Sequence, residues 1–402
     1  MEERTRAYLR GRFGDYYRRA EITPPPDANE REWGYIPWTS EPGTTMVRHE
    51  SLLDLGDLES FLERERPRHV YFSAGRYDDP SAGSMSEKGW RSSDLVFDLD
   101  ADHLPAVTLG EDSYAEMLAK CKDALLRLLD FLEEDFGFED LTIAFSGGRG
   151  YHVHVRDPGI QHLESDARRE IVDYVRGMGL ETEHLYTDEI RGGSTVRVLE
   201  KRGGWGRRTH EALLNLAEDL RDLDRDEARK RLLDIDGIGE GRADTVLGAI
   251  SKSEDIQGEI EGSSVEMNYE AIEEGNVEFG GVGMRTLIET IAQETVEEDD
   301  APIDEPVTTD TNRLIRLPGT LHGGSGLAVR RIDRDAIVDF DPLVDAVPET
   351  FVGHEITVEV TDGGPVELRG DSFTLSEGEQ TVPEHLGVFL MARGRAEKGA
   401  EP

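Results

Sequence analysis

The stretch Leu95–Asp100, which reads Leu-Val-Phe-Asp-Leu-Asp, constrains the fold more than any other part of this chain. Apolar and acidic residues alternate along it, which is the period of a strand with one buried face and one exposed face. We expect Phe97 and Leu99 to point into the core, so that Asp98 and Asp100 share the opposite face. Two carboxylates placed in this way lie about 7 Å apart at Cα and can converge on a pair of divalent cations.

An acidic pair of this kind is a weak signal by itself, because the chain holds 86 Asp and Glu residues among 402. At that frequency roughly 18 acidic-x-acidic triplets arise by chance, and most of them lie on solvated surfaces. The apolar residues around Asp98 and Asp100 argue against a solvated surface. The residues alone therefore leave open both a metal site and a plain acidic strand.

The negative net charge of the chain does not by itself exclude a protein that binds nucleic acid. With 45 Lys and Arg against 86 Asp and Glu, the formal net charge is −41, whereas proteins that grip nucleic acid are usually basic. The acidic excess is spread through the whole chain and is not confined to one tail, which is typical of a protein from a high-salt cell. Local clusters of basic residues are consequently more informative than the net charge.

The chain is long enough for a sizeable core and for two or three domains. Its one cysteine, Cys121, rules out an internal disulfide and any cysteine-rich zinc site. The first residues, 1–4, are charged, and no apolar run approaches the roughly 20 residues that a membrane helix needs. We therefore expect a soluble cytoplasmic protein that makes no contact with a membrane.

Periodicity predicts a mixture of helices and strands. We expect helices over 4–20, 58–66, 114–134, 166–178, 205–222, 225–233, 284–295 and 384–392. We expect strands within 33–38, 69–74, 95–100, 141–145, 151–155, 355–367 and 372–375. The stretch 75–93 is predicted as a loop, and the acidic stretch 254–278 as a surface excursion.

Glycines between two predicted strands indicate a hairpin at residues 146–150, which read Ser-Gly-Gly-Arg-Gly. A strand follows these glycines, whereas a helix follows them in the dinucleotide and P-loop motifs. The backbone N–H groups of the turn, with Arg149 and His152, form a plausible cradle for phosphate. An ordinary glycine hairpin with polar-face histidines is the alternative.

A second glycine-containing turn, at residues 235–243, resembles a helix-hairpin-helix that presents backbone N–H groups to a DNA phosphate. Arg242 is its only cation, and the helix after the turn has no further signal, so a plain helical hairpin is favoured. Positive charge is instead concentrated at Arg313, Arg316 and His322, beside Pro318 and several glycines.

Three features stand in chain order: the acidic strand, the motif Ser-Gly-x-Arg-Gly-x-His at 146–152, and a basic segment ending in Pro-x-Thr-x-His at 318–322. Together they resemble the catalytic small subunit of the archaeal and eukaryotic type of DNA primase, from the first helix to about Arg331. The second and third features are specific, and Asp98 with Asp100 alone is not.

The resemblance implies an α/β (α+β) fold in which two mixed-sheet units pack together as the primase catalytic core, with a small helical subdomain inserted. We expect the core to span 1–352 and the insertion to span about 205–262. Residues 353–402 are then a C-terminal extension of strands and a helix that packs on the core.

The resemblance also implies roles for individual residues. Asp98 and Asp100 match the first two metal-binding carboxylates. The third carboxylate lies well upstream of the Pro-x-Thr-x-His motif in the family, and that spacing falls on Asp304 and not on Asp310. The triphosphate contacts match the following residues: Ser146, Arg149, His152, Arg313, Arg316 and His322.

The expected activity is template-directed synthesis of short primers from nucleoside triphosphates on single-stranded DNA. An all-oxygen site favours Mg²⁺, with Mn²⁺ as a common substitute. Many relatives carry a zinc knob after the acidic strand, but residues 101–121 keep only His103 and Cys121, so we expect no zinc. Some relatives also carry a lysine soon after the closing histidine, where this chain has Gly323 and Gly324.

The implied partners are single-stranded DNA, nucleoside triphosphates and a large subunit that carries an iron–sulfur cluster, for which this chain has no cysteine set. A related polymerase of the same chemistry, acting in DNA repair or primer extension, remains an alternative that the sequence does not separate. A non-catalytic scaffold is disfavoured because every matched position is filled. A DxD glycosyltransferase is disfavoured because it gives the Arg and His clusters no role.

Overall fold

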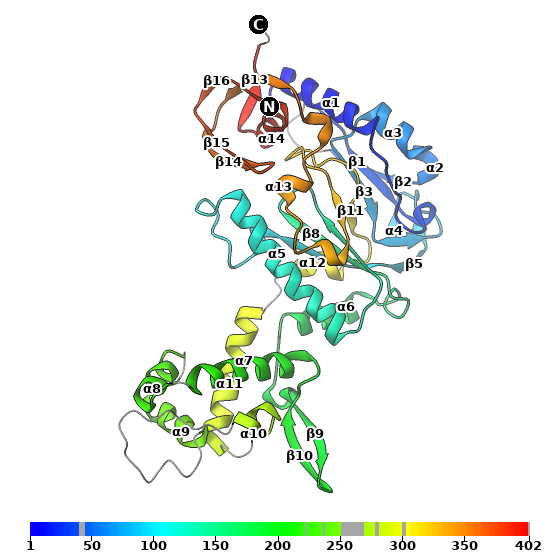
Figure 1. The fold of residues 1–402 in the computed structure, drawn as a ribbon. Helices are drawn as coiled ribbons and strands as arrows, with labels where there is room; N and C mark the ends of the chain where they lie inside the picture. The colour runs from blue at the N-terminus through cyan, green and yellow to red at the C-terminus, as the bar shows by residue number, and fades with distance from the viewer. Residues whose placement is uncertain are drawn as a thin grey trace. The chain divides into compact units, whose positions relative to one another are not determined.

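The computed structural model describes residues 1–39, 45–221, 223–235, 238–250, 269–277, 281–299 and 303–400. These residues form two compact units (Figure 1). Unit 1 comprises Met1–Leu126, Phe138–Val172 and Pro302–Pro402. Unit 2 comprises Arg127–Gly137 and Asp173–Ala301, and it includes the described part of the segment 205–262.

The acidic strand lies at the edge of a four-stranded sheet in unit 1. The strand order is β12-β7-β8-β6, with β6 at Leu95–Asp100, β7 at Leu141–Phe145, β8 at Gly150–Val155 and β12 at Arg330–Ile332. The predicted hairpin of β7 and β8 is confirmed, because Phe145 lies directly opposite Tyr151. This hairpin holds the glycine turn next to the end of β6.

A second four-stranded sheet of unit 1 ends in a strand from the basic segment. Its order is β11-β3-β1-β2, with β1 at Trp33–Ile36, β2 at Val47–Glu50, β3 at His69–Ser73 and β11 at Leu314–Arg316. Strands far apart in sequence meet here, since Arg316 of β11 lies opposite Tyr71 of β3. A buried cluster of Ala74, Val96, Val307 and Ile315 joins residues from both sheets.

Helices cover these sheets, and most of them agree with the predicted ranges. The helices that begin in unit 1 before the basic segment are α1 (Glu3–Tyr17), α2 (Leu52–Leu55), α3 (Leu58–Glu65), α4 (Met85–Lys88), α5 (Tyr114–Asp130) and α6 (Ser165–Val175). Two short helices, α12 (Glu305–Thr309) and α13 (Pro342–Asp345), flank the basic segment. The predicted apolar stripe of α5 is confirmed, because Leu118, Leu125 and Leu129 are all buried.

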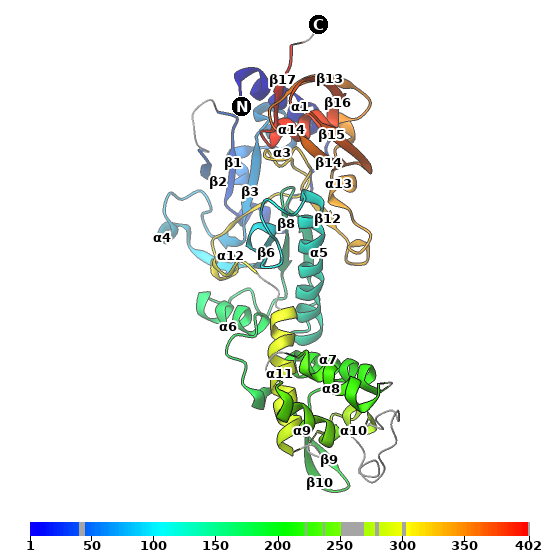
Figure 2. The same ribbon diagram turned by 90° about the vertical axis from the view of Figure 1, so that its left-hand side faces the viewer.

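The C-terminal segment of unit 1 contains the following elements: β13 (Glu355–Val360), β14 (Gly364–Leu368), β15 (Asp371–Leu375), β16 (Gly378–Pro383), α14 (Glu384–Ala392) and β17 (Ala396–Lys398). Helix α14 is buried along its whole length and packs on β13. Strand β17 lies beside α1 (Figure 2). The Lys398 backbone N–H donates to Thr5 Oγ1 at 2.8 Å. The two ends of the chain are therefore part of one packed unit.

The strand directions differ from our expectation. Every strand pair among the described residues is antiparallel, so these sheets are not mixed. Parallel neighbours need crossover connections, usually helical, whereas short turns such as the one between β7 and β8 produce antiparallel pairs.

The loop predicted at 75–93 is also wrong in part. This segment contains β4 (Gly75–Tyr77) and β5 (Trp90–Ser93), which pair with each other on either side of α4. Strands of three and four residues are too short for an apolar alternation to show in the sequence.

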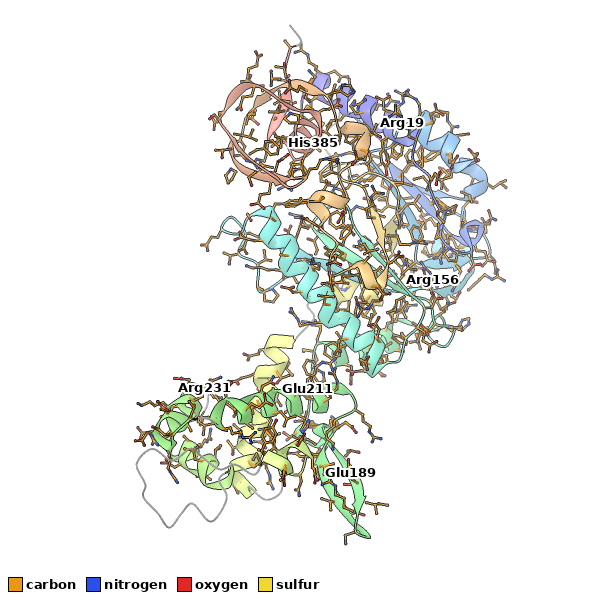
Figure 3. The ribbon with its side chains drawn as sticks, viewed as in Figure 1. Arg19, Arg156, Glu189, Glu211, Arg231 and His385 are labelled. Atoms are coloured by element: carbon orange, nitrogen blue, oxygen red, sulfur yellow. The ribbon has the colours of Figure 1, made fainter. Side chains whose placement is uncertain are left out.

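Unit 2 is mainly helical and also contains a β-hairpin that the sequence did not predict. Its main elements are β9 (Tyr186–Arg191), β10 (Ser194–Leu199), α7 (Gly204–Arg221), α8 (Arg225–Leu233), α9 (Glu240–Ile250), α10 (Tyr269–Glu273) and α11 (Gly281–Asp299). Arg207 and Glu211 form an ion pair at 3.0 Å on α7. Glu211 and Arg231 are labelled on the helices of this unit in Figure 3. Helices α8 and α9 pack together, but residues 236–237 of the predicted turn and most of 254–278 lie outside the described residues. No described helix combines the length and the apolarity needed to cross a bilayer.

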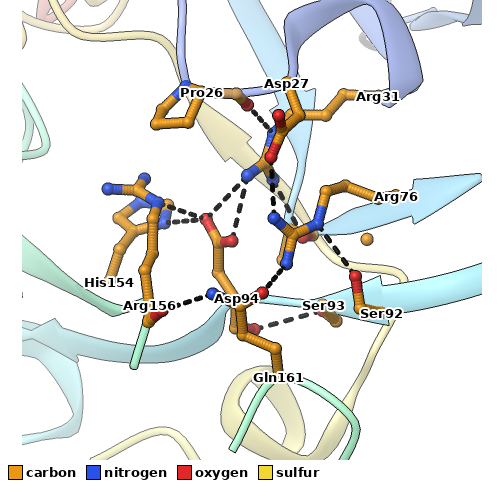
Figure 4. A network of polar contacts seen from close by, with 12 residues as sticks. Pro26, Asp27, Arg31, Arg76, Ser92, Ser93, Asp94, His154, Arg156 and Gln161 are labelled. Atoms are coloured by element: carbon orange, nitrogen blue, oxygen red, sulfur yellow. Dashed lines mark hydrogen bonds and ion pairs between the residues drawn. The ribbon is translucent and has the colours of Figure 1, made fainter. Parts of the chain in front are cut away.

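A fully buried carboxylate, Asp94, anchors the start of β6 (Figure 4). Its Oδ1 accepts a hydrogen bond from Arg31 Nη2 at 2.9 Å, and its Oδ2 accepts one from Arg156 Nε at 2.9 Å. His154 Nδ1 lies 3.3 Å from the same Oδ2, and Arg168 Nη1 donates to the Asp94 carbonyl at 2.9 Å. Burial opposes ionisation, but the hydrogen bond with His154 and the charges of Arg31 and Arg156 hold the pKa of Asp94 below its usual range.

We expect Asp94→Asn to destabilise the protein strongly, by about 3–5 kcal/mol, because it leaves buried guanidinium groups without their counter-charge. The change in apparent unfolding free energy, measured by urea denaturation at fixed salt, tests this. Asp335→Asn removes one exposed carboxylate from the same unit and serves as the control. Equal stability of the two variants would show that the ion network contributes little.

Candidate functional site

The predicted two-faced character of β6 is present in the structure. Phe97 and Leu99 are fully buried, whereas Asp98 and Asp100 remain partly exposed on the other face. Asp98 lies opposite His152 of β8, and His152 Nε2 is 3.2 Å from Asp98 Oδ1. Asp100 lies opposite Gly150, where a Cβ atom would come within 1.7 Å of the Leu99 carbonyl oxygen. Only glycine fits at that position.

The third predicted carboxylate, Asp304, lies directly beside β6. It precedes α12 as the N-cap residue, and its backbone N–H donates to the Asp98 carbonyl at 3.0 Å. Helix α12 packs on β6, so a short segment about two hundred residues downstream in the sequence joins the acidic strand. Asp310 follows the same helix, and its Oδ1 accepts a hydrogen bond from the Asn312 N–H at 2.8 Å.

The carboxylates influence each other's ionisation. Burial and the charge of Asp98 raise the pKa of Asp304, and Asp100 adds to this effect. Burial also opposes ionisation of Asp98, but His152, Arg316 and Arg313 lower the pKa of Asp98 overall. The site therefore concentrates negative charge that a cation would relieve.

The glycine turn between β7 and β8 is held on several sides. Gly147 adopts a φ of +76°, and the Gly148 N–H donates to Ser146 Oγ at 3.3 Å. Tyr114 donates its hydroxyl hydrogen to the Gly148 carbonyl. Arg149 projects from the turn, is partly exposed, and pairs with Asp102 at 2.6 Å.

The closing histidine lies against this turn. A Cβ atom at Gly148 would lie 3.2 Å from His322 Nε2, and Ser325 links the two segments by donating to the Gly147 carbonyl. Burial and the nearby Arg316, His69, Arg68 and Arg149 hold the pKa of His322 well below its usual range. Positive groups from three separate segments therefore surround one histidine.

A pocket of ≈ 450 Å³ collects six of the nine predicted site residues. The six are Asp98, Asp100, His152, Asp304, Arg313 and Arg316. Ser146, Arg149 and His322 do not line this pocket; they belong to the adjoining turn and closing loop.

The pocket lining also includes residues that the sequence did not predict. They are Met46, Arg48, Tyr71, His103, Asp310, Asn312, Leu314 and Ile315. Arg48 and Tyr71 come from β2 and β3, where no motif marks them, and only the pairing of strands distant in sequence brings them to the site. His103 and Asp310 follow the two acidic segments directly, which is a signal that sequence reasoning could have used.

The donor set of the pocket fits a hard divalent cation, since Asp98, Asp100 and Asp304 supply only carboxylate oxygens. In the described part of the chain, however, no three His, Cys, Asp or Glu side chains are arranged to hold a metal ion. Asp98 Oδ1 is engaged by His152, and Asp100 Oδ1 accepts a hydrogen bond from the Asp102 N–H at 3.2 Å. Metal binding would therefore require these carboxylates to exchange such contacts by rotating their side chains.

The chain is similar in sequence to one known protein family over the region that contains the predicted site residues. The profile of a family described as "DNA primase small subunit" matches residues 97–334, which include all nine site residues predicted from the sequence. The chain is 65% identical over 408 residues to the DNA primase small subunit PriS of Haloarcula marismortui, covering 100% of both chains. It is 60% identical over 401 residues to that of Halorubrum lacusprofundi, again covering 100% of both. It is 41% identical over 414 residues to that of Methanothrix thermoacetophila, covering 99% of this chain and 100% of the relative.

Proposed function

Because this chain belongs to the DNA primase small subunit family and is therefore a nucleotidyltransferase, we propose that the pocket beside β6 is its catalytic site. The observation that carries this proposal is the convergence of β6, α12 and β11, which brings three carboxylates and two arginines to one pocket. We infer that it joins nucleoside triphosphates into primers on single-stranded DNA.

In this proposal Asp98, Asp100 and Asp304 hold Mg²⁺ or Mn²⁺. Bound divalent cations supply activation of the primer 3′-hydroxyl and charge neutralisation on the departing pyrophosphate. Asp98 is oriented for this role by its register opposite His152, and Asp304 is positioned by its N–H bond to the Asp98 carbonyl. The absence of zinc stays a prediction, with Cys121 buried on α5 and His103 exposed after β6.

The basic residues of the pocket and of the adjoining turn are proposed to bind the triphosphate. Ser146, Arg149, His152, Arg313, Arg316 and His322 form this group. Arginine and histidine donors neutralise charge that develops on phosphate oxygens, and a guanidinium can do so with two parallel hydrogen bonds. The Nε atom of Arg316 is buried and has no hydrogen-bond partner within the described part of the chain, which supports the presence of an anionic ligand.

The name "small subunit" of the relatives leads us to propose a large-subunit partner that carries the iron–sulfur cluster. We also propose that the fold is the primase catalytic core with a helical insertion, and that the protein acts on DNA in the cytoplasm.

The direct test is incorporation of labelled nucleotides on unprimed single-stranded DNA in molar KCl, with and without the large subunit. We expect products only when Mg²⁺ or Mn²⁺ is present. Equal product yield in excess chelator would contradict a metal-dependent reaction at this site.

We expect Arg149→Ala and His322→Ala to weaken nucleotide binding, because charge-assisted contacts to phosphate contribute roughly 1.5–3 kcal/mol each. The Michaelis constant for the incoming nucleotide should rise by about tenfold or more, whereas the Kd for template should change little. Steady-state kinetics and template binding measured on the same preparations separate the two effects. A loss confined to template binding would place these residues on the DNA path.

A further inference from the structure

Arg68, which no motif in the sequence marked, lies against the closing loop. It directly precedes β3, and its backbone N–H donates to the Ile36 carbonyl at 2.7 Å, so the second sheet fixes its position. Its Nε donates to the Gly323 carbonyl at 3.3 Å, and its guanidinium carbon lies 5.6 Å from the centre of the Trp38 ring. The side chain is thus held between the second sheet and the residue that follows His322.

The glycine after the closing histidine is explained by this side chain. A Cβ atom at Gly323 would lie 2.0 Å from Arg68 Cγ and 2.8 Å from Arg68 Nε. Any larger residue would displace the Arg68 side chain from the loop. Arg68 therefore fills the space that a side chain at position 323 would otherwise take.

Arg68 lies near a second arginine, Arg316, and two histidines, His69 and His322. Burial lowers the pKa of His322, and the nearby Arg316, His69 and Arg68 lower it further. Neither Arg68 nor Arg316 has an ion-pair partner among the described residues, although the chain holds 86 acidic residues against 45 basic ones. Partly buried arginines normally pair with carboxylates, so a group of unpaired ones points to an anionic ligand.

We propose that Arg68 is a further nucleotide-binding residue, which donates hydrogen bonds to a phosphate of the incoming nucleoside triphosphate beside His322. This inference rests on the proposed function, which places the triphosphate at the closing loop. Arg68 then completes a group of donors contributed by the start of β3, the end of β11, the glycine turn and the closing loop.

The test compares Arg68→Gln, Arg68→Lys and Arg64→Gln. Arg64→Gln removes the same charge from α3 nearby, where Arg64 is exposed and pairs with Glu65 at 2.9 Å. We expect Arg68→Gln to raise the Michaelis constant for nucleotide at least tenfold, with kcat and the Kd for single-stranded DNA within about twofold. Arg68→Lys keeps the charge and should show a smaller rise, and Arg64→Gln should show none.

Binding of inorganic tripolyphosphate, followed by calorimetry, provides a readout that does not depend on activity. We expect Arg68→Gln to weaken it about tenfold relative to wild type and Arg64→Gln. If wild type makes primers but Arg68→Gln binds tripolyphosphate and nucleotide as wild type does, this inference is wrong while the proposed function holds. If wild type makes no primers, the proposed function fails, whatever the tripolyphosphate result. Equal defects in Arg68→Gln and Arg68→Lys would show that Arg68 acts through packing and would also overturn the inference.

Discussion

Asp98→Ala and Asp100→Ala should each lower nucleotide incorporation by about a thousandfold or more, which corresponds to roughly 4 kcal/mol of transition-state stabilisation. Each removes one carboxylate from a pocket in which Asp98, Asp100 and Asp304 are the proposed metal ligands. If these residues hold the metal, losing one of them would weaken the activation of the attacking hydroxyl and the charge neutralisation on the leaving pyrophosphate. Single-turnover incorporation on a primed template measures the effect without the complication of initiation.

The fold should survive these changes. Asp98 and Asp100 are partly exposed, and the charge of Asp98 opposes ionisation of Asp304, so removing it relieves repulsion. Melting temperatures close to that of wild type should therefore accompany the loss of activity. Asp98→Asn is a milder variant that retains an oxygen acceptor for His152. Incorporation within tenfold of wild type in either alanine variant would refute the assignment of these two residues.

The second large effect separates two neighbouring acidic residues. Asp304→Asn should lose activity to the same degree as Asp98→Asn, whereas Asp310→Asn should keep most of it. Both residues line the pocket and flank α12, but only Asp304 is hydrogen-bonded to the β6 backbone. The charge of Asp98 also helps to raise the pKa of Asp304. Asp310 instead accepts a hydrogen bond from the Asn312 N–H. The carboxylate of Asp310 therefore closes a local turn.

The pair serves as its own control, because the two substitutions make the same chemical change at the two ends of one five-residue helix. Steady-state incorporation rates at saturating Mg²⁺ provide the comparison. An inactive Asp310→Asn together with an active Asp304→Asn would show that the third carboxylate has been assigned to the wrong end of α12.

The parts of the fold that local pattern controls were predictable. The alternation in Leu95–Asp100 correctly placed Phe97 and Leu99 in the core, because a strand has a period of two and one face of β6 is covered. The boundaries of the last helix, α14, also agree with the prediction, since its residues form one apolar run that is buried throughout. The hairpin at 146–150 followed from glycines that allow a positive φ.

The parts that depend on distant contacts were not predictable from pattern. Arg31, Asp94 and Arg156 are far apart in sequence, and nothing in their local surroundings shows that they form one buried ion network. Arg68 and Gly323 are 255 positions apart in the sequence, yet the Arg68 side chain fills the space that a side chain at position 323 would need. The placement of Asp304 beside Asp98 was expected from family spacing and not from any physical signal in residues 303–310.

The claim that the three carboxylates form the metal centre is tested most directly by counting bound metal. Mn²⁺ binding, followed by electron paramagnetic resonance in molar KCl with nucleotide present, should show about two tight sites per wild-type chain. The double variant Asp98→Asn/Asp304→Asn should lose them. The control Asp335→Asn/Asp339→Asn, which removes two exposed charges from the same unit, should keep them. The same number of tight Mn²⁺ sites in the Asp98/Asp304 variant as in wild type would contradict this account.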